Sequence, residues 1–265
     1  MIPVRTISLV LSVVCLALPA WADFQAGVDA HRRGDYATAL NEWRPLAEQG
    51  DAVAQYNLGI LYAKGRGVPQ DYAQARQWYE KAAAQGNAKA QTFLGALYAN
   101  GGGTPLDHVQ ARQWYEKAAA QGDVNAEFYL GTMYFNGQGV LQDSGQARLW
   151  WEKAAEQGDV SAQISLATLY VTGNGIPQDY PTAFFWFRQA GYQEDALAQG
   201  QVGFMYENGQ GVPQDYVQAH MWFNLSSAKG EKLSQGFRDA LAKRMTLAQI
   251  AEAQKLAREW KPKTP

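Results

Sequence analysis

Hydrophobic and polar positions recur along this chain with a fixed spacing of 36 residues. A tyrosine, an aspartate and a tryptophan each return five times at that spacing, and a Gly-x-Gly triplet lies between the tyrosine and the aspartate of every copy. A period of this length is typical of solenoids, in which each repeat packs only on its neighbours. The recurring residues are Tyr62, Tyr98, Tyr134, Tyr170 and Tyr206; Asp71, Asp107, Asp143, Asp179 and Asp215; and Trp78, Trp114, Trp150, Trp186 and Trp222.

Each copy is predicted to form two helices. In the first copy, Ala54, Leu58 and Tyr62 are four residues apart and define one apolar stripe. The segment 65–69, Gly-Arg-Gly-Val-Pro, ends that helix, and Asp71 is expected to cap the next one. The tryptophans and tyrosines are expected to fill the spaces between helix pairs, with small alanines allowing the paired helices to approach closely.

The two ends of the array depart from the repeat. Residues 23–50 are predicted to form a degenerate leading helix pair, and the five copies span 51–86, 87–122, 123–158, 159–194 and 195–230. Residues 231–265 are expected to be a C-terminal helical cap and tail. Leu233, Phe237 and Leu241 form one stripe there, and Thr246-x-x-Gln249 has the pattern of a capping box.

The repeat unit resembles the Sel1-like repeat, a relative of the tetratricopeptide repeat. Its pattern is Ala-x-Ala-Gln-x-x-Leu-Gly-x-x-Tyr-x-x-Gly-x-Gly, then Asp-x-x-x-Ala-x-x-Trp-Tyr-x-Lys-Ala-Ala, found at 52–86 and repeated to Gly230. The resemblance implies an all-α, right-handed α/α superhelical solenoid that serves as an adaptor in protein complexes at membranes and in bacterial envelopes. The fourth copy departs from the pattern, with Ala167 and Glu194 where glycine is usual.

Residues 1–22 have the pattern of a secretory signal peptide. Arg5 precedes an apolar run from Ile7 to Leu18, and small residues at Ala20 and Ala22 predict cleavage after Ala22. The run of about a dozen residues is short of the ~20 needed to span a bilayer, so no integral membrane segment is expected after cleavage. The predicted location is periplasmic or secreted.

The sole cysteine, Cys15, lies inside that signal, and Val14 before it is too large for a lipoprotein signal. The mature chain would therefore lack cysteine. Lys and Arg number 23 against 25 for Asp and Glu, a balance that gives no broad basic face, so nucleic acid is not an expected partner. His31, His108 and His220 show no metal-ligand spacing. No cofactor, metal or small-molecule substrate is expected.

Ser226-Ser-Ala-Lys229 matches the Ser-x-x-Lys nucleophile motif of penicillin-recognising enzymes. The companion motifs Ser-Asp-Asn and Lys-Thr-Gly are missing from the sequence, and other copies carry alanine pairs at this position. A small residue in a packed helix is the favoured interpretation. An acyl-enzyme hydrolase of β-lactams or peptidoglycan acting through Ser226 stays as a remote alternative.

The favoured function is a non-catalytic scaffold that binds a protein or peptide in a concave groove. A second hypothesis is a dedicated assembly or regulatory factor of an envelope complex, such as one for polysaccharide export or secretion. In tetratricopeptide-like solenoids the first helix of each pair lines the groove, and large apolar, Thr and Asn side chains vary there. The groove candidates are Tyr56, Ile60, Lys64, Thr92, Ala96, Asn100, Phe128, Thr132, Phe135, Asn136, Ile164, Thr168, Phe204 and Asn208.

Overall fold

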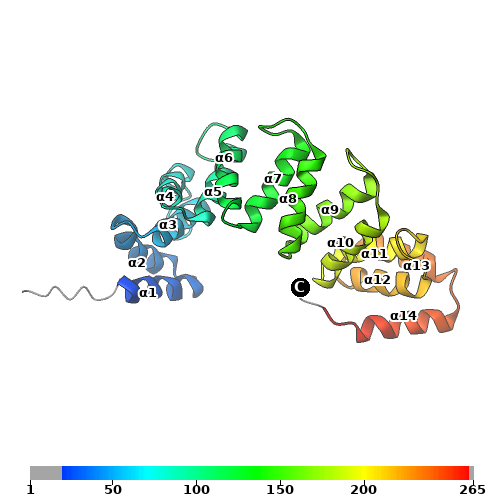
Figure 1. Ribbon diagram of the computed structural model, residues 1–265. Coiled ribbons are helices and arrows are strands. Elements are labelled where there is room, and N and C mark those ends of the chain that lie inside the picture. Colours follow the sequence, from blue (N-terminus) through cyan, green and yellow to red (C-terminus); the bar gives the residue numbers. More distant parts are fainter. Residues whose placement is uncertain (1–19, 263–265) are drawn as a thin grey trace, which may run out of the picture. The chain divides into compact units, whose positions relative to one another are not determined.

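The computed structural model describes residues 20–262, which form fourteen α-helices and no strand (Figure 1). The predicted signal peptide, 1–22, lies outside the described residues except for its last three positions. The helices are α1 (Ala20–Arg32), α2 (Tyr36–Glu48), α3 (Ala52–Lys64), α4 (Tyr72–Ala84), α5 (Ala88–Asn100), α6 (His108–Ala119), α7 (Val124–Asn136), α8 (Ser144–Glu156), α9 (Val160–Thr172), α10 (Tyr180–Tyr192), α11 (Ala196–Asn208), α12 (Tyr216–Ala228), α13 (Lys232–Ala242) and α14 (Leu247–Glu259).

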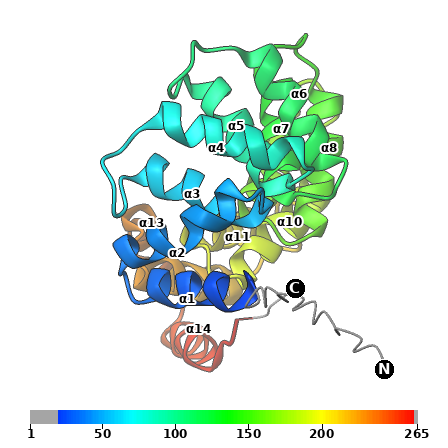
Figure 2. The same ribbon diagram turned by 90° about the vertical axis from the view of Figure 1, so that its left-hand side faces the viewer.

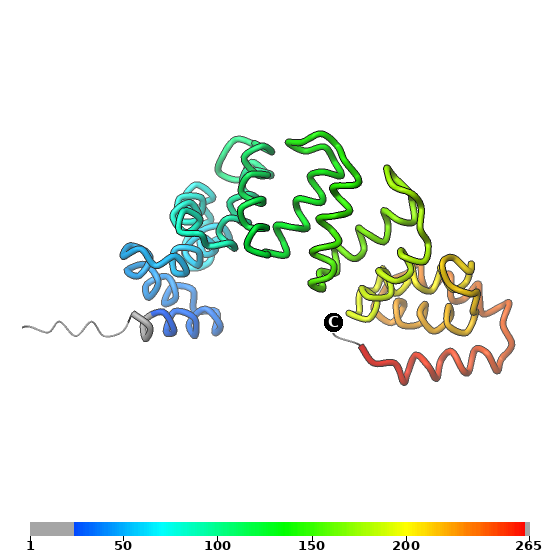
Figure 3. The backbone as a smooth tube through the Cα atoms, in the orientation of Figure 1, coloured from blue at the N-terminus to red at the C-terminus, as the bar shows by residue number. Residues whose placement is uncertain are grey.

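The helices belong to two compact units, one of residues 1–85 and one of residues 86–265. The described part of the first unit holds α1–α4, and that of the second holds α5–α14. Within each unit, consecutive helices pack as antiparallel pairs, such as α3 with α4 and α7 with α8 (Figures 2 and 3). The all-α helical-repeat solenoid expected from the sequence is confirmed.

Aspartate caps set where the second helix of each copy begins. Asp71 Oδ1 accepts a hydrogen bond from the backbone N–H of Gln74 at 2.9 Å. In each later copy the corresponding aspartate accepts from the N–H three residues further on; these aspartates are Asp107, Asp143, Asp179 and Asp215. These bonds satisfy amide groups that the first turn of a helix leaves without a partner. The predicted row of caps is confirmed. The first helices have an equivalent row: Asp51, Asn87, Asp123, Asp159 and Asp195.

The two glycines of the Gly-x-Gly triplet have different roles. Gly65 ends α3 in the left-handed region, with φ at 63°. Gly67, with φ at 73°, lies against the preceding helix pair, where a Cβ would come within 2.7 Å of the carbonyl carbon of Tyr36. In the third copy, a Cβ on Gly139 would be 2.6 Å from the carbonyl carbon of His108. The second glycine is therefore a junction residue as well as a turn residue.

The most deeply buried aromatic of each copy is the residue after the recurring tryptophan. Tyr115 is 2% exposed, and its ring lies so close to Gly95 that a Cβ there would be 2.7 Å from it. Trp114 is only half-buried, with Lys117 Nζ 3.9 Å from its ring centroid. The recurring tryptophans thus fill the spaces between helix pairs only in part: Trp78, Trp150 and Trp186 are partly buried against the core clusters, and Trp222 is buried. The buried aromatics are Tyr79, Tyr115, Trp151, Phe187 and Phe223.

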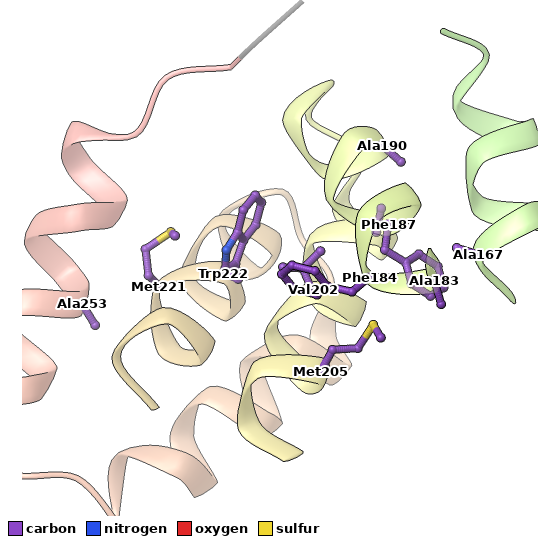
Figure 4. Close-up of a cluster of buried hydrophobic side chains, with 11 residues drawn as sticks. Ala167, Ala183, Phe184, Phe187, Ala190, Val202, Met205, Met221, Trp222 and Ala253 are labelled. Carbon is purple, nitrogen blue, oxygen red and sulfur yellow. The ribbon is translucent and has the colours of Figure 1, made fainter. Parts of the chain in front are cut away.

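The irregular fourth copy keeps a continuous core. Ala167 and Phe187 are buried in a cluster that extends to Trp222 and to Ala253 of the last helix (Figure 4). Glu194 adopts φ of 68° at a position where the other copies have glycine, and its carboxylate pairs with Lys229 Nζ at 3.4 Å. It is the one non-glycine residue with positive φ among residues 20–262.

The C-terminal stripe is only partly buried. Leu241 is fully buried, and Phe237, although 42% exposed, has its ring 5.8 Å from that of buried Phe223, whereas Leu233 is 71% exposed. The capping box at Thr246 and Gln249 is confirmed, since each side chain bonds to the other's backbone N–H.

Candidate protein-binding surface

The predicted groove residues differ widely in accessibility. Thr92 is buried, with its hydroxyl donating to Asp123 Oδ1 at 2.9 Å, so the expectation that it faces a partner is wrong. Phe128 and Phe135 are half-buried and pack against the core around Trp151, with the ring centroids of Phe135 and Trp151 5.4 Å apart. Tyr56, Ile60, Ala96, Thr132 and Ile164 are also half-buried, whereas Lys64, Asn100, Asn136, Thr168, Phe204 and Asn208 are exposed.

Other apolar residues of the first helices, which were not predicted, are also exposed. Phe93 is 38%, Tyr129 39% and Leu197 52% exposed. Phe93 and Tyr129 directly follow the predicted positions Thr92 and Phe128, and one residue along a helix turns the side chain by about 100°. We define the outward stripe as the exposed and half-exposed face of α7, α9 and α11. Its residues are Asn125, Tyr129, Thr132, Asn136, Ser161, Ser165, Thr168, Thr172, Leu197, Gln201, Phe204 and Asn208.

The outward stripe carries no charged side chain. Several of its polar side chains bond to their own helix: the Thr132 hydroxyl donates to the Phe128 carbonyl at 3.1 Å, and Asn208 Nδ2 donates to the Phe204 carbonyl at 2.9 Å. Because these donors are already satisfied, they are not free to bond a partner. The stripe therefore presents an uncharged surface on which the large apolar side chains are isolated. Such a surface suits an apolar peptide or helix face.

An apolar pocket of about 340 Å³ lies at the end of the stripe, between α11 and α13. Its apolar walls are Leu197, Phe204, Leu233 and Phe237, with the rings of Phe204 and Phe237 6.1 Å apart, and Glu231 is the one charged residue of the lining. Gly200 also lines it, at the repeat position that holds Tyr56, Thr92, Phe128 and Ile164 in the earlier copies. The loss of a side chain at Gly200 lets Ser234 approach, since a Cβ there would be 2.5 Å from its hydroxyl oxygen. Sequence periodicity could not reveal this pocket, because one wall belongs to the non-repeating cap.

A second pocket, of about 310 Å³, lies in the first unit and is basic. It is bordered by Val28, His31 and Arg32 of α1, Trp43 of α2, Asn57, Ile60 and Lys64 of α3, and Arg66 of the following loop. Burial lowers the pKa of His31, and the positive charges of Arg66 and Lys64 lower it further. Ile60 and Lys64 were predicted site residues; the other members come from outside the repeat positions considered.

Ser226 and Lys229 do not form a nucleophile and base pair. The Ser226 side chain is fully buried, and its hydroxyl donates to the Ala196 carbonyl at 2.6 Å and lies 2.8 Å from the Ser234 hydroxyl. Lys229 Nζ contacts Glu194 instead. An acylated serine needs an accessible oxygen with its activating group in reach, which this arrangement does not provide. The small packed residue predicted from the sequence describes Ser226 well.

Within residues 20–262, no group of three or more His, Cys, Asp or Glu side chains is arranged to hold a metal ion. None of the helices in that range is long and apolar enough to cross a membrane.

Comparison with known proteins places this geometry in a family. The family model described as the Sel1 repeat matches residues 52–87, 88–123, 124–159, 160–195 and 196–231. No curated protein matches the chain. Among solved structures, a protective antigen present in uropathogenic Escherichia coli strains, which displays an SLR fold, is 34% identical with a TM-score of 0.81. The match covers 91% of this chain and 54% of the antigen, so the chain spans about half of the antigen's length.

Two further structures are similar. A Sel1 repeat protein from Oxalobacter formigenes is 29% identical with a TM-score of 0.72, covering 92% of this chain and 99% of that protein. An immunity protein from Pseudomonas aeruginosa, 21% identical with a TM-score of 0.50 and 82% coverage of each chain, shares the fold alone. Proteins with these repeats generally act as protein–protein interaction scaffolds. Five matched copies over helix pairs of the expected kind show that the chain belongs to the Sel1 repeat family.

Proposed function

We propose that this protein is an exported, non-catalytic scaffold that binds a segment of a partner protein along the outward stripe. The observation that carries the proposal is the exposure of Tyr129 on α7 and of Leu197 and Phe204 on α11, with an apolar pocket beside α11. Exposed apolar residues gathered in this way are typical of protein interaction sites.

The chemistry of the stripe defines the segment that it would bind. Apolar side chains at Leu197 and Phe204 require apolar partner residues, and the 340 Å³ pocket has room for a side chain as large as leucine or phenylalanine. Because the stripe is uncharged, we expect affinity to change little between low and high salt.

Export is the second part of the proposal. It is supported by the signal-peptide pattern of residues 1–22 and by the description of the E. coli relative as a protective antigen. Mass spectrometry of the protein from a periplasmic or secreted fraction should give Asp23 as the first residue. A chain retaining Met1 in the cytoplasmic fraction would contradict export.

The binding surface is tested by paired variants. We compare Leu197→Ser/Leu233→Ser, which alters the pocket, with Leu141→Ser/Leu149→Ser, which alters two other exposed leucines. Both variants should melt within a few degrees of the wild type, because all four side chains are more than two-fifths exposed.

Partner capture is measured by crosslinking and quantitative pull-down from the envelope of the native host. The pocket variant should weaken capture by about tenfold or more, as is usual for the loss of a central anchor. Equal capture by the wild type and both variants would move the binding surface elsewhere on the molecule.

A further inference from the structure

We propose that the basic pocket of the first unit, formed by His31, Arg32, Lys64 and Arg66 around Trp43, binds a carboxylate of an acidic protein segment. The inference deepens the proposed function, because it takes the ligand to be part of a protein partner. It concerns a separate site from the outward stripe and predicts a different chemistry for it.

Carboxylates of the described residues neutralise only part of the pocket's positive charge. Arg32 lies 3.6 Å from Asp29, and this pair is exposed. For Lys64 and Arg66, the described part of the chain offers no carboxylate within 4.0 Å. Arg66 is held in place by the ring of Tyr36, whose centroid is 5.0 Å from the guanidinium carbon. The pocket therefore keeps a net positive charge that a bound carboxylate would neutralise.

These charges are not needed by the repeat itself. The positions that correspond to Lys64 are Asn100, Asn136, Thr172 and Asn208, and those that correspond to Arg66 are Gly102, Gln138, Asn174 and Gln210. The later copies form the same helix and the same loop without a cation at either place. The repeat fold therefore does not require a cation at either place, and the charges of Lys64 and Arg66 are available to a ligand.

The lining favours an acidic peptide over a small free anion. Val28, Ile60 and Trp43 form an apolar wall beside the cations. A glutamate or aspartate flanked by apolar residues would use both parts of the pocket, whereas inorganic phosphate would use the cations alone. Binding should weaken steeply with salt, in contrast to binding on the outward stripe.

His31 reports on occupancy of the pocket. The charges of Lys64, at the end of α3, and of Arg66, in the loop after it, act on the His31 ring. Asp29 and Arg32 are the charged neighbours of His31 on its own helix. The ring centroids of Tyr36 and Trp43 are 5.2 Å and 5.7 Å from that of His31. A carboxylate that neutralises Lys64 and Arg66 removes their effect, so binding should raise the pKa of His31. The chain has three histidines, which makes the ring signals assignable by substituting each one.

The experiment is an NMR titration of the histidine rings in the full mature chain. The probe is the capped peptide acetyl-Leu-Glu-Phe-Glu-Leu-amide, with the glutamine version of the same peptide and inorganic phosphate as comparisons. The variant is Lys64→Met/Arg66→Met. Its matched control is Arg33→Met/Lys81→Met, which removes the same two charges elsewhere in the first unit. Thermal melts establish that both variants fold.

We expect the acidic peptide to raise the pKa of His31 saturably and to leave His108 and His220 unchanged. Lys64→Met/Arg66→Met should raise the pKa of His31 without peptide and weaken peptide binding about tenfold or more, while the control binds normally. An equal response to the glutamine peptide, or none to either peptide, would overturn the proposal. A response to phosphate as strong as that to the peptide would replace it with a small-anion site. Neither result affects the Leu197/Leu233 test of the outward stripe.

Discussion

At the scale of single residues, the adjacent aromatics Trp114 and Tyr115 of α6 contribute differently to the core. Tyr115 is 2% exposed and presses on Gly95, whereas Trp114 is half-buried beneath Lys117. Tyr115→Ala should therefore lower the free energy of unfolding by roughly 3–5 kcal/mol, and Trp114→Ala by roughly 1–2 kcal/mol. Urea unfolding followed by circular dichroism measures both. A larger loss for Trp114→Ala would contradict the assignment of Tyr115 to the core.

A buried carboxyl gives the second residue-scale prediction. Glu127 is 5% exposed, and it occupies a repeat position held by Gln55, Gln91, Gln163 and Gln199 in the other copies. Burial raises the pKa of the Glu127 carboxyl, although a 2.7 Å hydrogen bond from Gln157 Nε2 opposes the shift. In the window between the unfolded and the higher folded pKa, the folded chain binds more protons, so stability from this group falls as pH rises.

Glu127→Gln removes that cost. The variant should melt above the wild type at pH 7, and its advantage should shrink as the pH falls through the folded pKa and the wild-type carboxyl becomes neutral. Thermal melts from pH 4 to pH 8 measure the difference. Glu156→Gln, on the exposed end of α8, is the control and should show no such trend. A lower midpoint for Glu127→Gln at pH 7 would show that the charge is stabilised in place.

At the scale of helices, the sequence predicts caps and breaks better than it predicts faces. Asp71 and Gly65 act locally, so their residue types determine their roles. Which face of a helix is buried depends on the helices that pack against it. In α3, apolar residues lie on nearly every side, from exposed Val53 to buried Leu58, so periodicity alone cannot choose the buried face. For the same reason Trp114 and Tyr115, both apolar and adjacent, could not be ranked before the packing was known.

The candidate site shows the same limit. Reasoning from repeat positions selected Ile60, Lys64 and Phe204 as groove residues. In the structure, Ile60 and Lys64 line the basic pocket and Phe204 lines the apolar one. It also assigned Thr92 and Phe128 to the surface. In the structure, contacts with the next helix pair bury Thr92 wholly and Phe128 in part. Arg66 lies in the loop directly after α3, outside the positions considered, whereas Leu233 belongs to the cap and only the folded chain brings it beside α11.

The Gly-x-Gly loop gives a prediction at this scale, because it offers a matched pair. Gly137 and Gly139 have the same φ of 68°, so alanine suffers the same backbone strain at either place, about 1–2 kcal/mol. A Cβ on Gly137 would meet its nearest neighbour at 3.3 Å, whereas one on Gly139 would be 2.6 Å from the His108 backbone. Gly139→Ala should thus cost at least about 1 kcal/mol more than Gly137→Ala in urea unfolding. Equal costs would mean that the loop shifts freely away from α6.

At the scale of the whole molecule, a solenoid is stabilised by contacts between neighbours, so damage should stay local. In the second unit, α14 packs on α12, and Ala253 shares a buried cluster with Met221 and Trp222. Ending the chain at Met245 would expose those two side chains, which are now 6% and 3% exposed. Hydrogen exchange should then lose protection strongly in α12 and α11 while α6 and α7 keep theirs.

A chain ending at Pro262 is the control for this deletion, because it lacks only three residues and keeps α14. It should exchange like the full chain throughout. The pocket between α11 and α13, which we propose as a binding site, shares its helices with the weakened region, so the chain ending at Met245 should also bind a partner less well than the control. A uniform loss of protection from α5 to α12 would show instead that the second unit unfolds as one cooperative body, in which the cap supports every copy equally.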